Sequence, residues 1–124
     1  MSEGKELSAA SVDELVRVFA GFALQQDKAV LTWDVKTTNR LYHKLEAVEQ
    51  ELKSRDGDQR KALMTLYNHP NPQVRVKAAK ATLALAPQLA RRVLEEVAKD
   101  FGSPQCLEAG MSLSNLDRGI YKPT

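Results

Sequence analysis

Apolar residues recur every three or four positions along most of this chain, which is the spacing of helices with one buried face. No stretch alternates apolar and polar residues as a half-buried strand does. The pattern therefore predicts an all-α protein without a sheet. Proline, glycine and aspartate interrupt the periodicity and divide it into about five helices.

The first apolar pattern follows a helix-start signal. Ser11 and Glu14 form a Ser-x-x-Glu capping box, in which each side chain can bond the other residue's backbone N–H. A helix is expected over about residues 12–26. Its apolar stripe consists of Val12, Leu15, Val16, Phe19, Phe22 and Ala23. Residues 1–10 lack such a stripe and are expected to form a flexible lead-in.

A longer pattern fills residues 27–56, which contain no proline or glycine. It predicts one helix of about 25 residues, roughly 38 Å long at 1.5 Å per residue. The helix should end at Asp56-Gly57-Asp58, because glycine suits a helix C-terminus and aspartate a following N-terminus. Residues 11–56 are therefore expected to form an N-terminal helical hairpin. The inward set is Leu31, Val35, Thr38, Leu41, Tyr42, Leu45, Val48 and Leu52.

Three shorter patterns complete the helical region over residues 58–100. Helices are expected over 58–68, 72–85 and 87–100, and Pro72 and Pro87 each stand where a first helical turn accepts proline. His69 and Pro70 belong to the intervening turn. The expected inward residues are Leu63, Leu66, Tyr67, Val74, Ala78, Ala81 or Thr82, Leu85, Leu89, Val93, Leu94 and Val97.

The tail, residues 101–124, contains several glycines and prolines, which weaken any helical pattern. A short helix is expected around residues 111–116. The tail has too many apolar side chains for a free segment, so it should pack along the last helices. These side chains are Leu107, Met111, Leu113, Leu116, Ile120 and Tyr121. Residues 11–124 then form a single helical domain.

The segment Asn71-Pro72-x-Val74-Arg75-x-x-Ala78-Ala79, with Leu83 and the helix led by Pro87, resembles a HEAT-type helical repeat. Such repeats stack helix pairs into an α-α superhelix. The resemblance implies HEAT-like helices over residues 58–100. One or two units fit, so the N-terminal helices should close the core.

Nearly the whole chain also resembles a small, uncharacterised bacterial family catalogued as a domain of unknown function. The resemblance rests on Lys36-x-x-Asn39-Arg40-Leu41-Tyr42, on the turn His69-Pro70-Asn71-Pro72-x-Val74-Arg75, and on Leu116-Asp117-x-Gly119. It implies no established activity. Small HEAT-like bacterial proteins include immunity proteins that neutralise toxins, which suggests such a role by analogy of fold.

Composition narrows the class of protein further. The net charge is +2, from 18 basic and 16 acidic residues, which does not require nucleic acid or a membrane as partner. The single cysteine, Cys106, excludes an internal disulfide and a multi-cysteine metal site. Neither a secretory signal nor a membrane span of about 18 apolar residues is visible, so a cytoplasmic protein without membrane contact is expected.

Candidate catalytic and metal-binding groups do not form a recognisable constellation. His43 and Glu46 lie one helical turn apart, but a lone His-x-x-Glu is more typical of a solvated face than of a metal site. His69 is better explained as a turn residue and Cys106 as a structural thiol. We therefore expect no catalytic, cofactor or metal residues. An enzyme using His43 or Asp34 in a cleft beside the tail is the least favoured hypothesis.

Charge distribution supplies an alternative function. Residues 72–100 carry six basic and three acidic side chains. A basic face could bind nucleic-acid phosphates, although an ordinary solvated helix face explains the same counts. The residues of this alternative are Arg75, Lys77, Lys80, Arg91 and Arg92.

Trp33 lies about 160–200° from the inward positions Leu31 and Val35 at 100° per residue. Packing under the first helix or the tail is the favoured explanation, because large aromatic side chains are usually buried. Exposure is the alternative, and exposed tryptophan is enriched at binding hot spots. The leading hypothesis is a non-enzymatic protein-interaction module with an unidentified protein partner. Its candidate contacts are Trp33, Arg40, Arg75, Arg91 and Arg92.

Overall fold

The protein is described here by a computed structural model that covers residues 3–124, with side chains from Glu6 onward. Over this range the chain is all-helical, which confirms the predicted fold class. It has six α-helices and one 3₁₀ helix within residues 3–124 rather than about five helices. The chain divides into two compact units, residues 1–62 and 63–124. A single domain over residues 11–124 stays a prediction.

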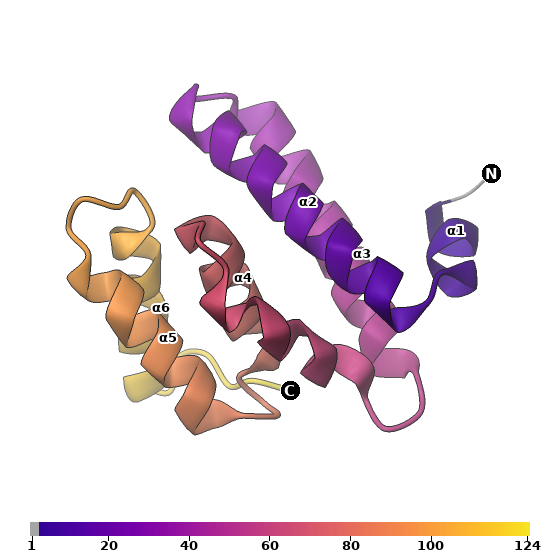
Figure 1. Cartoon of the computed structure of the whole chain (residues 1–124). Helices are drawn as coiled ribbons and strands as arrows, with labels where there is room; N and C mark the ends of the chain where they lie inside the picture. Colours follow the sequence, from indigo (N-terminus) through magenta and orange to yellow (C-terminus); the bar gives the residue numbers. More distant parts are fainter. Residues whose placement is uncertain (1–2) are drawn as a thin grey trace. The chain divides into compact units, whose positions relative to one another are not determined.

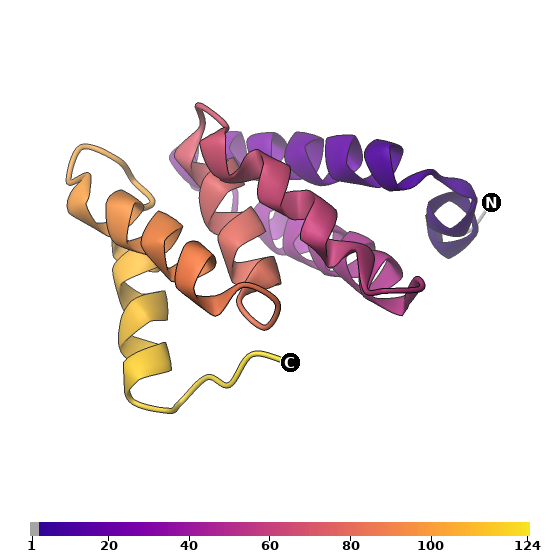
Figure 2. The ribbon, with the colours of Figure 1, turned by 60° about the horizontal axis from the view of Figure 1, so that its bottom comes forward.

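The first unit is built on a helical hairpin. Helices α2 (Val12–Leu31) and α3 (Val35–Ser54) lie side by side and antiparallel (Figures 1 and 2). The capping box is confirmed, since Glu14 N donates to Ser11 Oγ over 3.1 Å and Ser11 N to Glu14 Oε1 over 3.4 Å. The core of the unit comprises Leu7, Leu15, Phe19, Ala23, Ala29, Leu41, Leu45, Val48 and Leu52.

The expected flexible lead-in contains a helix, α1 (Glu3–Ala9). Two contacts explain why it forms. Leu7 is buried, and Arg55 Nη2 donates to the carbonyl oxygens of Leu7, over 3.0 Å, and Ser8, over 3.4 Å. These carbonyls belong to the last helical turn, which otherwise lacks partners. The contact joins residues 47 and 48 positions apart, so the local sequence does not indicate it.

The expectation of one uninterrupted helix over residues 27–56 is wrong. Helix α2 continues to Leu31, and α3 begins at Val35 after a short turn. Asp34 starts α3 as its N-cap, because its side chain accepts a hydrogen bond from Thr37 N. The sequence pattern does not predict this turn, because its left-handed residue is Trp33, with φ of 59°, rather than glycine.

The second unit contains α4 (Pro72–Thr82), α5 (Pro87–Lys99) and α6 (Cys106–Asp117), while the 3₁₀ helix η1 (Gln59–Asn68) leads into it. The turn before α4 is as predicted. Asn71 N donates to His69 Nδ1 over 3.0 Å, and Asn71 Oδ1 caps Gln73 N over 2.8 Å. One core cluster of this unit comprises Val76, Ala79, Leu83, Ala90, Val93, Leu94, Val97 and Ala109.

The tail packs on the last helices as expected, but through a longer helix. Helix α6 has 12 residues and contributes Ala109 to the core, with Leu113 and Leu116 packed against it. Leu107 and Met111 lie on the opposite face of α6 and are exposed, contrary to the prediction. Other apolar residues predicted to be inward are also exposed: Leu31, Val35, Tyr42, Leu85, Leu89, Ile120 and Tyr121.

Candidate protein-interaction surface

The turn between α2 and α3 is a Schellman motif with tryptophan at its left-handed position. Asp34 N donates to Ala29 O over 2.8 Å, and Trp33 N donates to Val30 O over 3.2 Å. These are the two hydrogen bonds of the motif, and the residue that donates the second one is usually glycine. Trp33 takes that position with φ of 59°, where a Cβ atom is unfavourable.

Further hydrogen bonds hold the turn on both sides. Thr32 Oγ1 donates to Lys28 O over 3.0 Å, and Thr38 Oγ1 donates to Asp34 O over 2.9 Å. Side-chain and backbone hydrogen bonds from Thr37 lower the pKa of Asp34, so its carboxylate is charged at neutral pH. The turn is therefore fixed by its own hydrogen bonds.

The turn carries a cluster of exposed apolar side chains at the end of the hairpin remote from α1 (Figure 1). We call Val30, Leu31, Trp33 and Val35 the tip surface. Trp33 is 88% exposed, so the favoured expectation that it packs under a helix or the tail is wrong. Arg40, further along α3, is also exposed. The tip surface and Arg40 thus lie in the same unit.

The other three candidate arginines lie in the second unit and differ in their surroundings. Arg91 forms a two-pronged ion pair with Asp117, at 2.8 and 3.1 Å, and contacts Glu95 at 3.5 Å. The hydrogen bond and charge of Asp117 raise the pKa of Arg91. Arg92 is exposed, whereas Arg75 is half-buried and its Nε is shielded without a hydrogen-bond partner among the described residues.

Internal ion pairs also occupy the lysines of the basic face. Glu108 accepts hydrogen bonds from Lys77 Nζ at 3.0 Å and Lys80 Nζ at 3.2 Å. Burial favours a raised pKa for Glu108, but the two lysine charges outweigh it and lower the pKa. Of the five residues proposed for phosphate binding, Lys77, Lys80 and Arg91 are therefore paired with carboxylates of the same unit.

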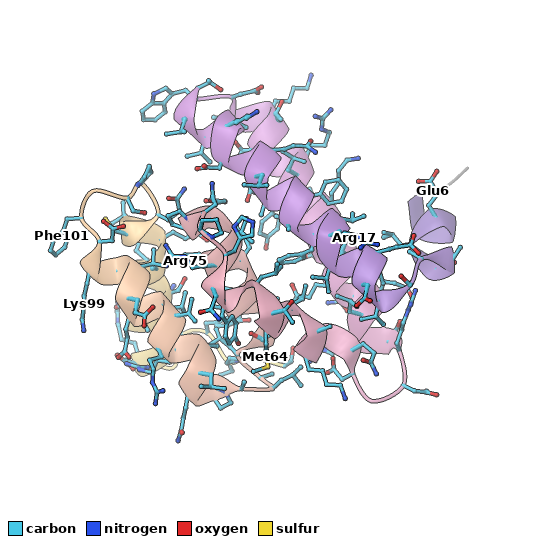
Figure 3. The ribbon with its side chains drawn as sticks, viewed as in Figure 1. Glu6, Arg17, Met64, Arg75, Lys99 and Phe101 are labelled. Carbon is cyan, nitrogen blue, oxygen red and sulfur yellow. The ribbon has the colours of Figure 1, made fainter. Side chains whose placement is uncertain are left out.

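Phe101 is an exposed aromatic residue that the sequence analysis did not select. It is 87% exposed and points away from the α5–α6 loop (Figure 3). A buried network fixes the loop behind it: Gln105 Nε2 donates to Gln73 Oε1, and Ser103 Oγ donates to Gln105 Oε1, both over 3.0 Å. The adjacent glycine and proline mark a loop, but they do not show that its phenylalanine is exposed.

The remaining chemical candidates include one pair of polar residues on α3. His43 and Glu46 are exposed on α3, and the ring of His43 meets that of Tyr42 edge-on at 5.5 Å. In the part of the chain that the structure describes, no group of three or more His, Cys, Asp or Glu residues could hold a metal ion. None of the described helices is both long enough and apolar enough to cross a membrane.

These features define a small all-α protein with an exposed apolar tip. The chain belongs to the family described as a domain of unknown function, DUF2019, whose model matches residues 13–117. It is similar to the protein RPA1889 from Rhodopseudomonas palustris CGA009, known from a crystal structure. The two are 44% identical with a TM-score of 0.91, over 95% of this chain and 98% of that one. None of the curated proteins matches this chain.

Proposed function

We propose that this protein is a non-enzymatic protein-interaction module that contacts its partner through the tip surface. Trp33 carries the proposal. It stands where the backbone favours glycine, and it leaves 88% of its surface in water. Neither property helps the fold, whereas an exposed tryptophan on a fixed turn suits a binding hot spot. Arg40 would supply a flanking charge contact.

Charge pairing favours a protein partner over nucleic acid. Phosphate binding needs basic groups that are free to replace counterions. Lys77, Lys80 and Arg91 already have carboxylate partners, which leaves less free charge on that face. Nucleic-acid binding is therefore treated as an alternative outcome of the experiment. Arg75 and Arg92 are secondary contacts in the proposal, as is Arg91, which is already paired with Asp117 of α6.

The proposal includes a HEAT-like arrangement of α4 and α5 and a place in the bacterial cytoplasm. The pattern Asn71-Pro72-x-Val74-Arg75-x-x-Ala78-Ala79 supports the first. The similar protein from Rhodopseudomonas palustris supports a bacterial setting. A role in toxin immunity is the narrowest form of the proposal, and it rests on analogy with small HEAT-like proteins alone.

A pull-down with matched variants tests the proposal. The tagged chain, Trp33→Gly and Phe101→Ser are each incubated with lysate of the source organism, with and without nuclease, and bound proteins are identified by mass spectrometry. Glycine fits the left-handed turn, so Trp33→Gly should fold. Phe101→Ser removes a similarly exposed aromatic residue from the other unit and is the control.

The expected result is one stoichiometric protein that survives nuclease, binds the Phe101→Ser variant and is lost with Trp33→Gly. Capture that is equal for Trp33→Gly and the unchanged chain would contradict a role for the tip surface. Recovery of nucleic acid that decreases steeply with salt would support the alternative on the basic face.

A further inference from the structure

A second candidate surface lies along α2, on the part of the first unit nearest α1. It is an open groove of about 470 Å³. Leu7, Val18, Gly21 and Phe22 form its apolar part, and Glu6 and Glu14 also line it. Glu14, Val18 and Gly21 are spaced by four and three residues, so the groove follows the α2 axis. Its shape suits an elongated ligand that lies along the helix.

Gly21 is not required by the packing of the chain itself. It lies in the middle of α2, with no left-handed φ, and a Cβ atom added there would meet nothing within 4 Å. Glycine in a helix interior lowers helix stability relative to alanine. A glycine with no internal reason, on the wall of a groove, is explained if another backbone must approach α2 closely.

The acidic residues of the groove lie at one of its ends. The charged residues that line the groove are both acidic, and both Glu6 and Glu14 are exposed. Lys44 Nζ lies 5.4 Å from the centre of the Phe22 ring, and Arg17 is on the flank of α2 (Figure 3). Lys44 and Arg17 are basic, so only the end of the groove that Glu6 and Glu14 line, beside α1, is acidic. This end complements a ligand whose corresponding end carries lysine or arginine.

We propose that this groove binds one amphipathic helix of a partner protein. The apolar face of that helix would lie on Val18, Gly21 and Phe22, and its basic end would lie near Glu6 and Glu14. This is the helix-in-groove mode, in which apolar residues at positions i, i+4 and i+7 anchor the ligand. The groove is separate from the tip surface at the other end of α2, so this inference does not depend on the proposed function.

The test is a selection from a displayed library of helical peptides, each about three to four turns long. The full chain is the target, and Gly21→Arg is used for counter-selection. Arginine at this position fills the groove and repels a basic ligand. The most enriched peptide is then synthesised, and its affinity is measured by fluorescence polarisation for the unchanged chain and for each variant. Circular dichroism verifies that each variant is helical.

The selected peptides should share apolar residues at helical spacing and carry lysine or arginine at one end. Binding should weaken at least about tenfold for Gly21→Arg and about threefold for Gly21→Ala, because even a Cβ atom stands where the ligand backbone approaches α2. Glu14→Gln keeps the capping box and should weaken binding about threefold, with a smaller salt dependence. Amide shifts of Val18 and Gly21 in the unchanged chain provide evidence that does not depend on any variant.

Several results would overturn this proposal. Peptides that bind Gly21→Arg as tightly as the unchanged chain would place the site elsewhere, as would shifts confined to other residues. Enrichment of acidic peptides, or no enrichment at all, would also refute it. A dimer that Gly21→Arg converts to a monomer would assign the groove to a second copy of the chain. Trp33→Gly should leave peptide binding unchanged, which separates failure here from failure of the tip surface.

Discussion

Replacing Trp33 by glycine and by alanine tests whether its backbone conformation is unfavourable. Both variants remove the indole and its small buried area, so that contribution cancels between them. Alanine keeps the Cβ atom that is unfavourable at φ of 59°, whereas glycine removes it. We expect Trp33→Gly to be more stable than Trp33→Ala, which is the reverse of the order at an ordinary helical position.

Two opposing energies set the size of the difference. A left-handed conformation costs an L-residue about 1–2 kcal/mol, while the entropy that glycine loses on folding costs about 0.5–1 kcal/mol. Their mid-range values, about 1.5 and about 0.75 kcal/mol, predict that Trp33→Gly exceeds Trp33→Ala in free energy of unfolding by about 0.75 kcal/mol. At Gly21, where φ is not left-handed, alanine should instead be the more stable residue by about 0.5–1 kcal/mol.

The measurement is urea unfolding followed by far-ultraviolet circular dichroism, because Trp33 is the only tryptophan and its removal abolishes the usual fluorescence signal. Gly21→Ala serves as the control for sign, since it compares the same two residue types within α2, the helix before the turn, without a left-handed φ. If Trp33→Ala proves as stable as Trp33→Gly, the turn is not strained, and the main argument for a functional Trp33 is lost.

Three further substitutions test the fold and its ion pairs by the same measurement. Ser11→Ala removes the capping box of α2 and should cost about 1 kcal/mol. Leu94→Ala leaves a cavity at a fully buried site and should cost about 2–5 kcal/mol. Glu108→Gln removes the carboxylate that pairs with Lys77 and Lys80. It should cost about 1–2 kcal/mol at neutral pH, a value between those typical of exposed and of buried ion pairs. The folded pKa of Glu108 lies below its ordinary value of 4.5. The cost should therefore be complete above pH 4.5 and disappear as the pH falls through the folded pKa. A cost that does not depend on pH would exclude the ion pairs as its source.

Local sequence signals predicted a helix end correctly where all the residues that form that end lie close together in the sequence. The Ser11 capping box, the turn around Asn71 and the proline starts of α4 and α5 are all complete within a few residues. Each signal acts through the backbone groups of its own helix end, so periodicity and capping rules are sufficient to find it.

The features that the sequence did not predict depend on contacts between distant residues or on an unusual residue. Helix α1 needs Arg55, and the tail helix α6 needs a core supplied by α5. The break between α2 and α3 contains tryptophan where rules of helix termination look for glycine. The exposure of Trp33 could not be inferred either. The angle between Trp33 and the inward positions was calculated for a continuous helix, but the chain turns at Trp33.

Trp33 and Gly21 are each at odds with the local structure that holds them. A left-handed turn favours glycine and contains tryptophan, while a regular helix interior favours alanine and contains glycine. Packing within the chain explains neither choice, since the indole is exposed and the space beside Gly21 is open. Natural sequences agree with their local structure except where function opposes it. Both exceptions fall on α2 and its turn, which is why we propose the first unit as the part of this protein that binds a partner.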